Sequence, residues 1–307
     1  MVHDEEVLLP RLRLGWLVLA SSLALAGACG DDATKATTGS PSASDAASAT
    51  LRVSGSTTVN AVAADAAEVL RQRGMKITVD SQGGSAGGIA QLGAGQVEVA
   101  MSSKPIADAD KAMFPSVDFV SSQIGADAVG IIIRREIFDG GVTSLDKDQA
   151  RRLFEGQVKN WKELGGPDVA VFVYDKEPGR GTREALDKYL YGKDGKAPPP
   201  PDSDNYAIVG GNEETRAKLL STEGSVGPLS TSFVTGFPKL VAVAVDGVKP
   251  DPANVKSGTY AMSRPLFLVT NGPATGPAKS FIDFVLSAEG QALVTKHGYL
   301  TLAELGL

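Results

Sequence analysis

The chain has 307 residues, a length that suits one large domain or two ordinary ones. Apolar residues make up 42% and charged residues 21%, and this globular composition excludes a collagen, a coiled coil and a wholly disordered chain. The net charge is -6 and no block of basic residues occurs, which excludes non-specific nucleic-acid binding through a basic face. With two histidines and one cysteine, the chain has too few ligands for a structural zinc site or a disulfide framework.

The N-terminal segment has the pattern of an export signal. Arg11 and Arg13 precede an apolar run, Leu14 to Ala26, which is shorter than the roughly 20 residues of a membrane span. Small residues then lead to Cys29, which resembles the lipidated cysteine of a bacterial lipobox, with alanine at the position of the usual leucine. We expect residues 1–28 to be an export signal and Cys29 to carry a lipid anchor. The alternative is a plain signal peptide with a chance cysteine.

The next segment is predicted to be a flexible tether. From Asp31 to Thr50, 14 of 20 residues are Ala, Ser or Thr. Such a composition buries too little apolar surface to offset the entropy lost on ordering. We therefore expect residues 29–50 to hold a folded domain near a membrane.

After Thr50, short apolar runs alternate with helical patterns, which predicts an α/β fold. The predicted strands are Leu51–Ser54, Lys76–Asp80, Val97–Met101, Val117–Val120, Ala128–Ile133, Val169–Tyr174, Val226–Leu229, Leu240–Val245 and Leu266–Val269. The predicted helices are Thr58–Arg73, Ala86–Leu92, Lys147–Phe154, Thr182–Tyr191, Glu213–Leu220, Ala278–Leu286 and Ala288–His297. A proline-rich stretch, Gly192–Asn205, is predicted to be an exposed loop.

Three clusters of glycine and hydroxyl residues each lie between a predicted strand and a predicted helix. They are Ser54-Gly-Ser-Thr-Thr58, Gly83-Gly-Ser-Ala-Gly-Gly88 and Gly179-Arg-Gly-Thr-Arg183. A helix N-terminus presents unpaired N–H groups and a positive partial charge, so it can bind an anion. Any one cluster alone is most simply an ordinary N-cap, whereas three together, one with two arginines, favour an anion site.

The first two clusters, then Met101-Ser-Ser-Lys-Pro105 and then the third cluster, in this order along the chain, resemble the phosphate-binding proteins of ABC importers. The C-terminal half adds Asp246-Gly-Val-Lys-Pro250, Ser263-Arg-Pro-Leu266 and Leu286-Ser-Ala-Glu-Gly-Gln291. The resemblance covers the chain from about Leu51 to its end. It implies an exported, non-enzymatic solute-binding protein that captures inorganic phosphate and delivers it to ABC permease subunits, as a monomer without cofactor or metal.

The resemblance also implies a type II periplasmic-binding fold, an α/β architecture of two lobes with a hinge and a ligand cleft between them. Residues 51–125 and 259–307 are expected to form lobe one, and residues 126–258 lobe two. The ligand-binding positions that it implies are Ser56, Thr57, Thr58, Ser85, Ser103, Lys176, Arg180, Gly181 and Thr182.

Two positions depart from the family pattern. Arg180 replaces a usual serine, and Ser103 stands where the best-known members have a carboxylate that accepts the proton of phosphate and repels sulfate. Asp127 is either a substitute acceptor or a hinge or capping residue. The choice among phosphate, arsenate, sulfate and molybdate therefore stays open.

Two other functions remain as alternatives. Gly83-Gly-Ser-Ala-Gly87 fits the Gly-x-Ser-x-Gly pattern of a serine hydrolase, in which Ser85 would be the nucleophile and His297 the base. His297, however, lies at the end of a predicted helix before Gly298, where a capping role is expected. The second alternative is a phosphate sensor or adhesin lipoprotein that kept the binding fold without transport.

Overall fold

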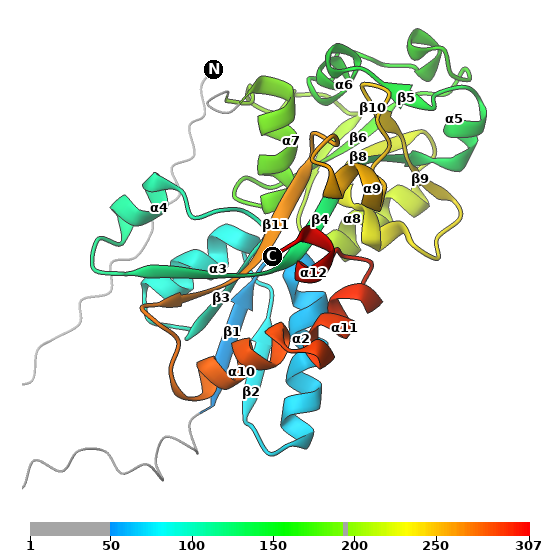
Figure 1. Ribbon diagram of the computed structural model, residues 1–307. Coiled ribbons are helices and arrows are strands. Elements are labelled where there is room, and N and C mark those ends of the chain that lie inside the picture. The colour runs from blue at the N-terminus through cyan, green and yellow to red at the C-terminus, as the bar shows by residue number, and fades with distance from the viewer. Residues whose placement is uncertain (1–49, 193–195) are drawn as a thin grey trace, which may run out of the picture. The chain divides into compact units, whose positions relative to one another are not determined.

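The computed structural model describes residues 50–192 and 196–307 (Figure 1). The expected export signal, Cys29 and all but the last residue of the tether lie outside the described residues. Within the described ranges, no helix is both long and apolar enough to cross a membrane.

Nine strands form one curled mixed sheet in the order β2-β1-β3-β11-β4-β8-β6-β7, with β9 paired to β4 (Figure 1). The strands are β1 (Leu51–Gly55), β2 (Ile77–Asp80), β3 (Val99–Ser102), β4 (Phe119–Arg134), β6 (Phe172–Lys176), β7 (Tyr206–Val209), β8 (Ser225–Ser230), β9 (Leu240–Ala242) and β11 (Ser263–Asn271). β1 is parallel to β2 and β3, and β6 is parallel to β7 and β8, whereas β4 and β11 run antiparallel to their neighbours. A separate parallel pair joins β5 (Ser144–Leu145) to β10 (Ala244–Val245).

Helices follow most strands, as α/β alternation requires. They are α2 (Thr57–Gln72), α3 (Gly84–Gly93), α4 (Asp108–Met113), α5 (Arg135–Asp139), α6 (Lys147–Phe154), α7 (Gly181–Tyr191), α8 (Asn212–Ser221), α9 (Pro252–Lys256), α10 (Gly276–Leu286), α11 (Ala288–Lys296) and α12 (Leu302–Leu305). Two 3-10 turns are η1 (Trp161–Leu164) and η2 (Thr231–Val234). In α2, buried positions recur every three or four residues, from Val59 through Val62 and Ala66 to Leu70. The apolar stripe that they form packs into the core beside β1, while Ser56 caps the helix by accepting from the Val59 N–H.

The apolar interior is divided into two main cores, which make two lobes. One core gathers residues of β1, α2, β3, α10 and α11, and the other gathers residues of β4, α6, β6 and α7. We call these halves lobe one and lobe two. Along the chain, core membership changes from lobe one to lobe two between Ile124 and Ala126 and back again between Met262 and Leu266, and Leu300 near the C-terminus packs in the core of lobe two once more. The exact lobe ranges, 51–125 with 259–307 and 126–258, stay predictions.

Strand β4 spans both lobes. Its residues Phe119–Ala128 pair with β11 and its residues Val129–Ile133 pair with β8. The sequence predicted two strands here, Val117–Val120 and Ala128–Ile133, because polar residues between them interrupt the apolar run. That prediction was wrong: hydrogen bonds to β11 continue through the polar segment, so one strand of 16 residues forms. The predicted helices match α2, α3, α6, α7, α8, α10 and α11 within a few residues at each end.

Candidate functional site

The three glycine and hydroxyl clusters converge on one small cavity. The space between its atoms, with its opening to solvent included, is about 210 Å³. Its lining residues are Ser56, Thr57, Thr58, Gly84, Ser85, Ser103, Lys176, Arg180, Gly181, Thr182, Gly210 and Asn212. Helices α2, α3, α7 and α8 all begin at residues of this lining. Four helix N-termini thus contribute positive partial charge to one small space. The arrangement suits a small anion.

Nine of the ten predicted ligand-binding residues line this cavity, and Asp127 is the exception. Four residues at or beside the cavity are not among those predicted from the sequence, namely Gly84, Gly210, Asn212 and Arg264. Asn212 follows a glycine pair at the start of α8, which is the same kind of signal that marked the other clusters. Arg264 lies within a motif that was noted for its resemblance alone.

Hydroxyl groups of lobe one form a buried network on one wall. The Ser56 hydroxyl donates to Ser103 Oγ at 3.0 Å, and Ser85 Oγ lies 3.2 Å from the same atom. The Ser103 backbone N–H donates to Ser85 Oγ at 3.1 Å. Ser103, whose identity departed from the family pattern, is therefore the centre of this wall.

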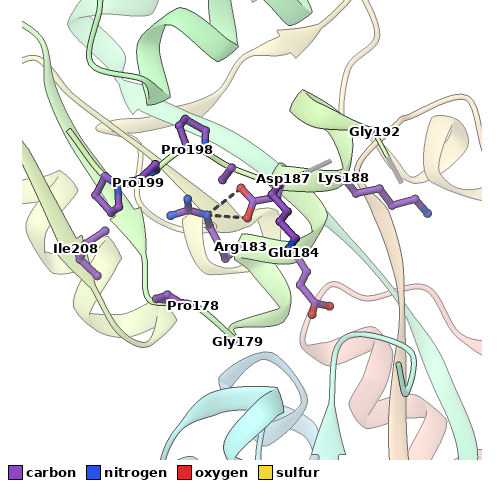
Figure 2. A pocket seen from close by; sticks show the side chains of 13 residues that line it. Pro178, Gly179, Arg183, Glu184, Asp187, Lys188, Gly192, Pro198, Pro199 and Ile208 are labelled. Atoms are coloured by element: carbon purple, nitrogen blue, oxygen red, sulfur yellow. Dashed lines mark hydrogen bonds and ion pairs between the residues drawn. The ribbon is translucent and has the colours of Figure 1, made fainter. Parts of the chain in front are cut away.

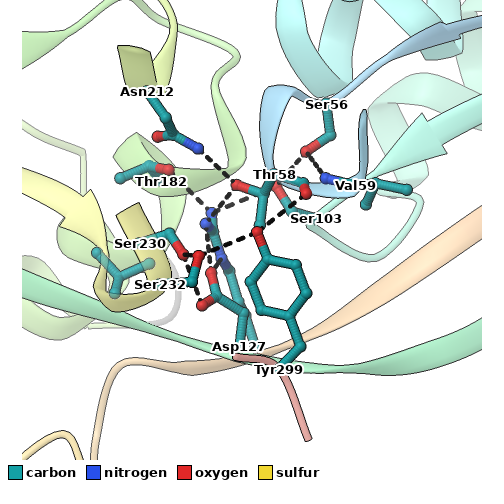
Figure 3. Close-up of polar contacts among 12 residues, drawn as sticks. Ser56, Thr58, Val59, Ser103, Asp127, Thr182, Asn212, Ser230, Ser232 and Tyr299 are labelled. Carbon is teal, nitrogen blue, oxygen red and sulfur yellow. Dashed lines mark hydrogen bonds and ion pairs between the residues drawn. The ribbon is translucent and has the colours of Figure 1, made fainter. Parts of the chain in front are cut away.

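Arg264 of β11 lies directly behind the cavity and is only 5% exposed. Its Nε and Nη2 donate to Asp127 Oδ2 at 3.1 and 2.8 Å, and the two residues are register partners on β11 and β4. Its Nη1 and Nη2 also donate to hydroxyl oxygens of the lining (Figure 3), namely Thr182 at 3.0 Å, Ser103 at 3.3 Å and Thr58 at 2.9 Å. Burial raises the pKa of the Asp127 carboxyl, while Arg264 and the Ser230 hydroxyl oppose that rise. Asp127 thus contacts Arg264 and does not line the cavity.

Lys176 is a buried cation at the opposite wall. Its Nζ donates to the carbonyl oxygens of Gly210 and Gly211 at 3.2 and 3.0 Å and to the Thr215 hydroxyl. Burial, together with the positive charges of Arg180 and Arg264, lowers the pKa of Lys176 to about 7. Lys176 therefore holds the loop before α8 in place and brings a charge that is easily lost.

Arg180 is tied to its own loop at the cavity mouth. Its Nη2 and Nε donate to Glu177 Oε2 at 2.6 and 3.0 Å, and its side chain lies against Gly84. A Cβ added to Gly84 would lie 2.6 Å from Arg180 Cδ, and the φ of Gly84 is positive, so glycine is required at this close approach. Arg180 and Gly84 therefore bring the two lobes together at the mouth.

Other contacts join the lobes around the cavity. Asn212 Nδ2 donates to Thr58 Oγ1 at 2.9 Å, and the Ala86 N–H donates to the Gly179 carbonyl at 3.1 Å. Lys104 Nζ donates to Glu184 Oε1 at 2.9 Å. The cavity is thus enclosed by groups from both lobes.

Arg183, which follows the third cluster, points away from the cavity. In the groove beside α7 its Nε donates to both Asp187 oxygens at 2.8 and 2.9 Å (Figure 2), and its Nη1 pairs with the buried Asp175. Carboxylates therefore hold the Arg183 guanidinium, and the residue does not line the cavity.

The geometry does not support the serine hydrolase. His297 Nε2 lies 2.9 Å from Asp65 Oδ2, a carboxylate that also accepts from Lys296 at 2.7 Å. Ser85 bonds to Ser103 instead, and among the hydrogen bonds of the described residues none joins Ser85 to His297. The two proposed catalytic groups belong to different networks.

Comparison with known proteins agrees with this site. The family model described as a PBP superfamily domain matches residues 40–289. The phosphate-binding protein PstS of Bacillus subtilis is 30% identical over 294 residues, covering 94% of this chain and 93% of the relative. The chain belongs to the phosphate-binding protein family. The PstS of Staphylococcus aureus is 27% identical over 237 residues, covering 73% of this chain and 69% of the relative.

Solved structures of this family have the same fold. A candidate phosphate ABC transporter substrate-binding protein from Clostridium perfringens, solved with bound phosphate, has a TM-score of 0.73 and 30% identity, covering 82% of this chain and 99% of that one. A phosphate transport receptor from Vibrio cholerae, at 24% identity and a TM-score of 0.64 over 82% and 99% of the two chains, supports the fold alone. The predicted two-lobe type II periplasmic-binding fold is confirmed.

Proposed function

We propose that the protein captures inorganic phosphate in the cleft between its lobes and delivers it to the permease of an ABC importer. The observation that carries this proposal is the convergence of four helix N-termini and a set of hydroxyl donors on one cavity of about 210 Å³. The names of the Bacillus subtilis and Clostridium perfringens relatives, and the phosphate bound to the latter, support it.

The proposed ligand contacts are hydrogen bonds from hydroxyl and backbone N–H donors. Ser56, Thr57, Thr58, Ser85, Ser103, Gly181 and Thr182 would surround the anion, while Lys176 and Arg180 would supply positive charge nearby. The chain carries a net charge of -6, so attraction of an anion has to arise locally in the cleft. A hydrogen bond to a charged group contributes roughly 1.5–3 kcal/mol, so many such bonds acting together are needed against the cost of desolvation and closure.

Delivery requires that the lobes separate. Among the described residues, β4 and β11 carry the chain from one core to the other, and Leu300 then packs against the core of lobe two again. We propose that bending of these strands opens the cleft at the permease and closes it on phosphate.

We also propose that the protein acts outside the cytoplasmic membrane as a non-catalytic monomer. The export pattern of residues 1–28 supports secretion, and the lipobox-like Cys29 supports a lipid anchor. A phosphate sensor without transport would bind the anion in the same way, and uptake of labelled phosphate by cells lacking the protein separates the two functions.

Calorimetric titration of the full chain with phosphate tests the proposed function. We expect binding in wild type and, in Ser85→Ala, an affinity weaker by roughly 1–3 kcal/mol because the site loses a buried donor. Ser280→Ala, on the exposed face of α10, is the matched control and should bind as wild type does. Absence of both binding heat and a phosphate-dependent thermal shift in wild type would refute the function. Labelling of Ser85 by a fluorophosphonate that disappears in His297→Ala would favour the hydrolase.

A further inference from the structure

Two side chains form the solvent side of the cavity. All of its lining residues are buried except Thr57 and Arg180, which are partly exposed. The Arg180 side chain is 13% exposed, as expected for a group at the mouth of a nearly closed space. Thr57 and Arg180 therefore separate an anion in the cavity from the surrounding water.

The Arg180 guanidinium lies between glycines of both lobes. A Cβ on Gly84, at the start of α3 in lobe one, would lie 2.6 Å from Arg180 Cδ and 3.0 Å from its Nη1. A Cβ on Gly210, before α8 in lobe two, would lie 3.1 Å from its Nη2. Because neither glycine has a side chain, the guanidinium lies directly against the backbone at both positions. Arg180 thus covers the mouth from one lobe to the other.

One nitrogen of this guanidinium has no acceptor in the described part of the chain. Nε and Nη2 donate to Glu177 Oε2 at 3.0 and 2.6 Å, whereas Nη1 makes no hydrogen bond to any described residue. Nη1 carries two N–H groups, and Arg180 lines the cavity, so these donors are available to the outermost oxygen of an anion. The serine that is usual at this position would bring one proton and no charge.

The charge of Arg180 also acts inside the cavity. Burial lowers the pKa of Lys176 to about 7, and the positive charge of Arg180 is the next largest cause. Near neutral pH the Lys176 ammonium is therefore charged only part of the time, whereas a guanidinium stays protonated. Arg180 is thus a permanent positive charge in the cavity lining.

Glu177 holds the Arg180 guanidinium in its place. The Glu177 carboxylate accepts both bonds through one oxygen, and it makes no other hydrogen bond among the described residues. The Glu177 backbone N–H donates to the Val209 carbonyl at 3.0 Å, which fixes this turn to the end of β7. Glu177 and Arg180 both belong to the loop before α7, so the pair can stay intact when the lobes separate.

We propose that Arg180 is a lid residue of the phosphate site, which covers the bound anion on the solvent side and donates to its outermost oxygen through Nη1. Glu177 is the positioning residue that keeps the guanidinium across Gly84. This inference rests on the proposed function and adds to it the residue that sets how long phosphate stays bound. When the lobes separate, Arg180 moves with lobe two and away from Gly84, and the mouth opens.

The rate of phosphate release tests the proposal on the full chain. Protein loaded with radiolabelled phosphate is mixed with excess unlabelled phosphate at about 0.15 M salt, and rapid filtration follows the loss of label. In Arg180→Ser we expect release about tenfold faster than in wild type, because a charge-assisted hydrogen bond to the anion is lost. Arg180→Met keeps a long side chain over the mouth without charge or donor, and it should release phosphate as fast as Arg180→Ser does.

Glu177→Gln separates positioning from charge. The Glu177 carboxylate repels an anion, so the loss of its charge alone would slow release. Loss of its hold on Arg180 acts in the opposite direction, and we expect release about threefold faster than in wild type. This acceleration should be absent when Glu177→Gln is combined with Arg180→Ser, since no guanidinium remains to be held.

Arg151→Ser is the matched control. Arg151 on α6 pairs with Asp148 three residues earlier, as Arg180 does with Glu177, and it does not line the cavity. Its release rate should equal that of wild type.

Three results would each overturn the proposal. They are release from Arg180→Ser within twofold of wild type, release from Arg180→Met as slow as in wild type, and release from Glu177→Gln that is unchanged, slower or still accelerated without Arg180. Where Arg180→Ser does not fold, Arg180→Met and Glu177→Gln carry the same test. Absence of phosphate binding in wild type would instead refute the proposed function.

Discussion

Gly181 is a point of close approach between the two lobes beside the cavity. It is the first residue of α7 in lobe two, and it faces Ser103, which follows β3 in lobe one. A Cβ on residue 181 would lie 2.3 Å from Ser103 Oγ, 2.8 Å from its carbonyl oxygen and 3.0 Å from its carbonyl carbon. Two of these atoms are backbone, which cannot rotate away. Gly181→Ala is therefore expected to oppose closure of the cleft.

The magnitude follows from the cost of overpacking. Inserting one methyl group into a well-packed contact costs about 1–3 kcal/mol, which corresponds to a 5- to 150-fold weaker phosphate affinity. Because the collision occurs only when the lobes meet, the free protein can relieve it by opening. Calorimetry should show the loss of affinity, and the melting temperature without phosphate should stay within about 2 °C of wild type.

Two glycines provide controls. Gly211→Ala makes the same change at the start of α8, where the new Cβ meets only Thr57 Cγ2 at 3.1 Å and its next neighbour lies at 4.0 Å, so its effect should be much smaller. Gly88→Ala would collide with Ser54 O at 2.6 Å inside lobe one and should lower the melting temperature itself. Phosphate affinity of Gly181→Ala within twofold of wild type, or a melting temperature lowered as far as in Gly88→Ala, would refute this reasoning.

Three further predictions concern charge and anchoring. At about pH 8.5 phosphate is already doubly charged, and Lys176, with a pKa of about 7, is mostly neutral in the free protein. Bound phosphate should raise the pKa of Lys176, so the protein should take up protons when it binds the anion. Calorimetry in buffers of different ionisation enthalpy should detect this uptake, and Lys176→Met should abolish it. Lys104→Met breaks the contact with Glu184 between the lobes and should speed phosphate release about twofold to fivefold in stopped-flow measurements, with no further effect in a Glu184→Gln background. Cys29→Ser should move the protein from the membrane fraction to the soluble fraction, and a wild-type protein found wholly in the soluble fraction would contradict lipidation.

The glycine and hydroxyl clusters could be predicted from sequence because each is a local signal. A strand end, a short turn and a helix start lie within a few residues of one another, and the backbone donors of the turn follow from that order. Gly210 and Gly211 also lie between a strand and a helix, as the glycines of the other clusters do. The pattern is weaker there because Asn212 stands where the other clusters have serine or threonine. It was missed for that reason.

Arg264 could not be assigned in the same way. Its partner Asp127 is 137 positions earlier in the chain, and only the antiparallel register of β4 and β11 brings the two together. In the sequence, Arg264 is one charged residue at the edge of an apolar strand, a position where most arginines reach solvent. The single strand β4 was missed for a related reason, since its polar middle is held by cross-strand pairing and not by local preference.

The position of the Asp127–Arg264 pair bears on how the two lobes would close around the cavity. The pair joins β4 and β11 at register partners, two residues before Val129, where β4 changes its neighbour from β11 to β8. In the bending that we propose about these strands, a group near the axis would move little, while the helix N-termini farther from it would move much more. Thr58 in lobe one and Thr182 in lobe two both bond to this nearly stationary guanidinium. In that proposed motion the Arg264 guanidinium would give both lobes one common point of contact, so that each closure would restore the same arrangement of donors around the cavity.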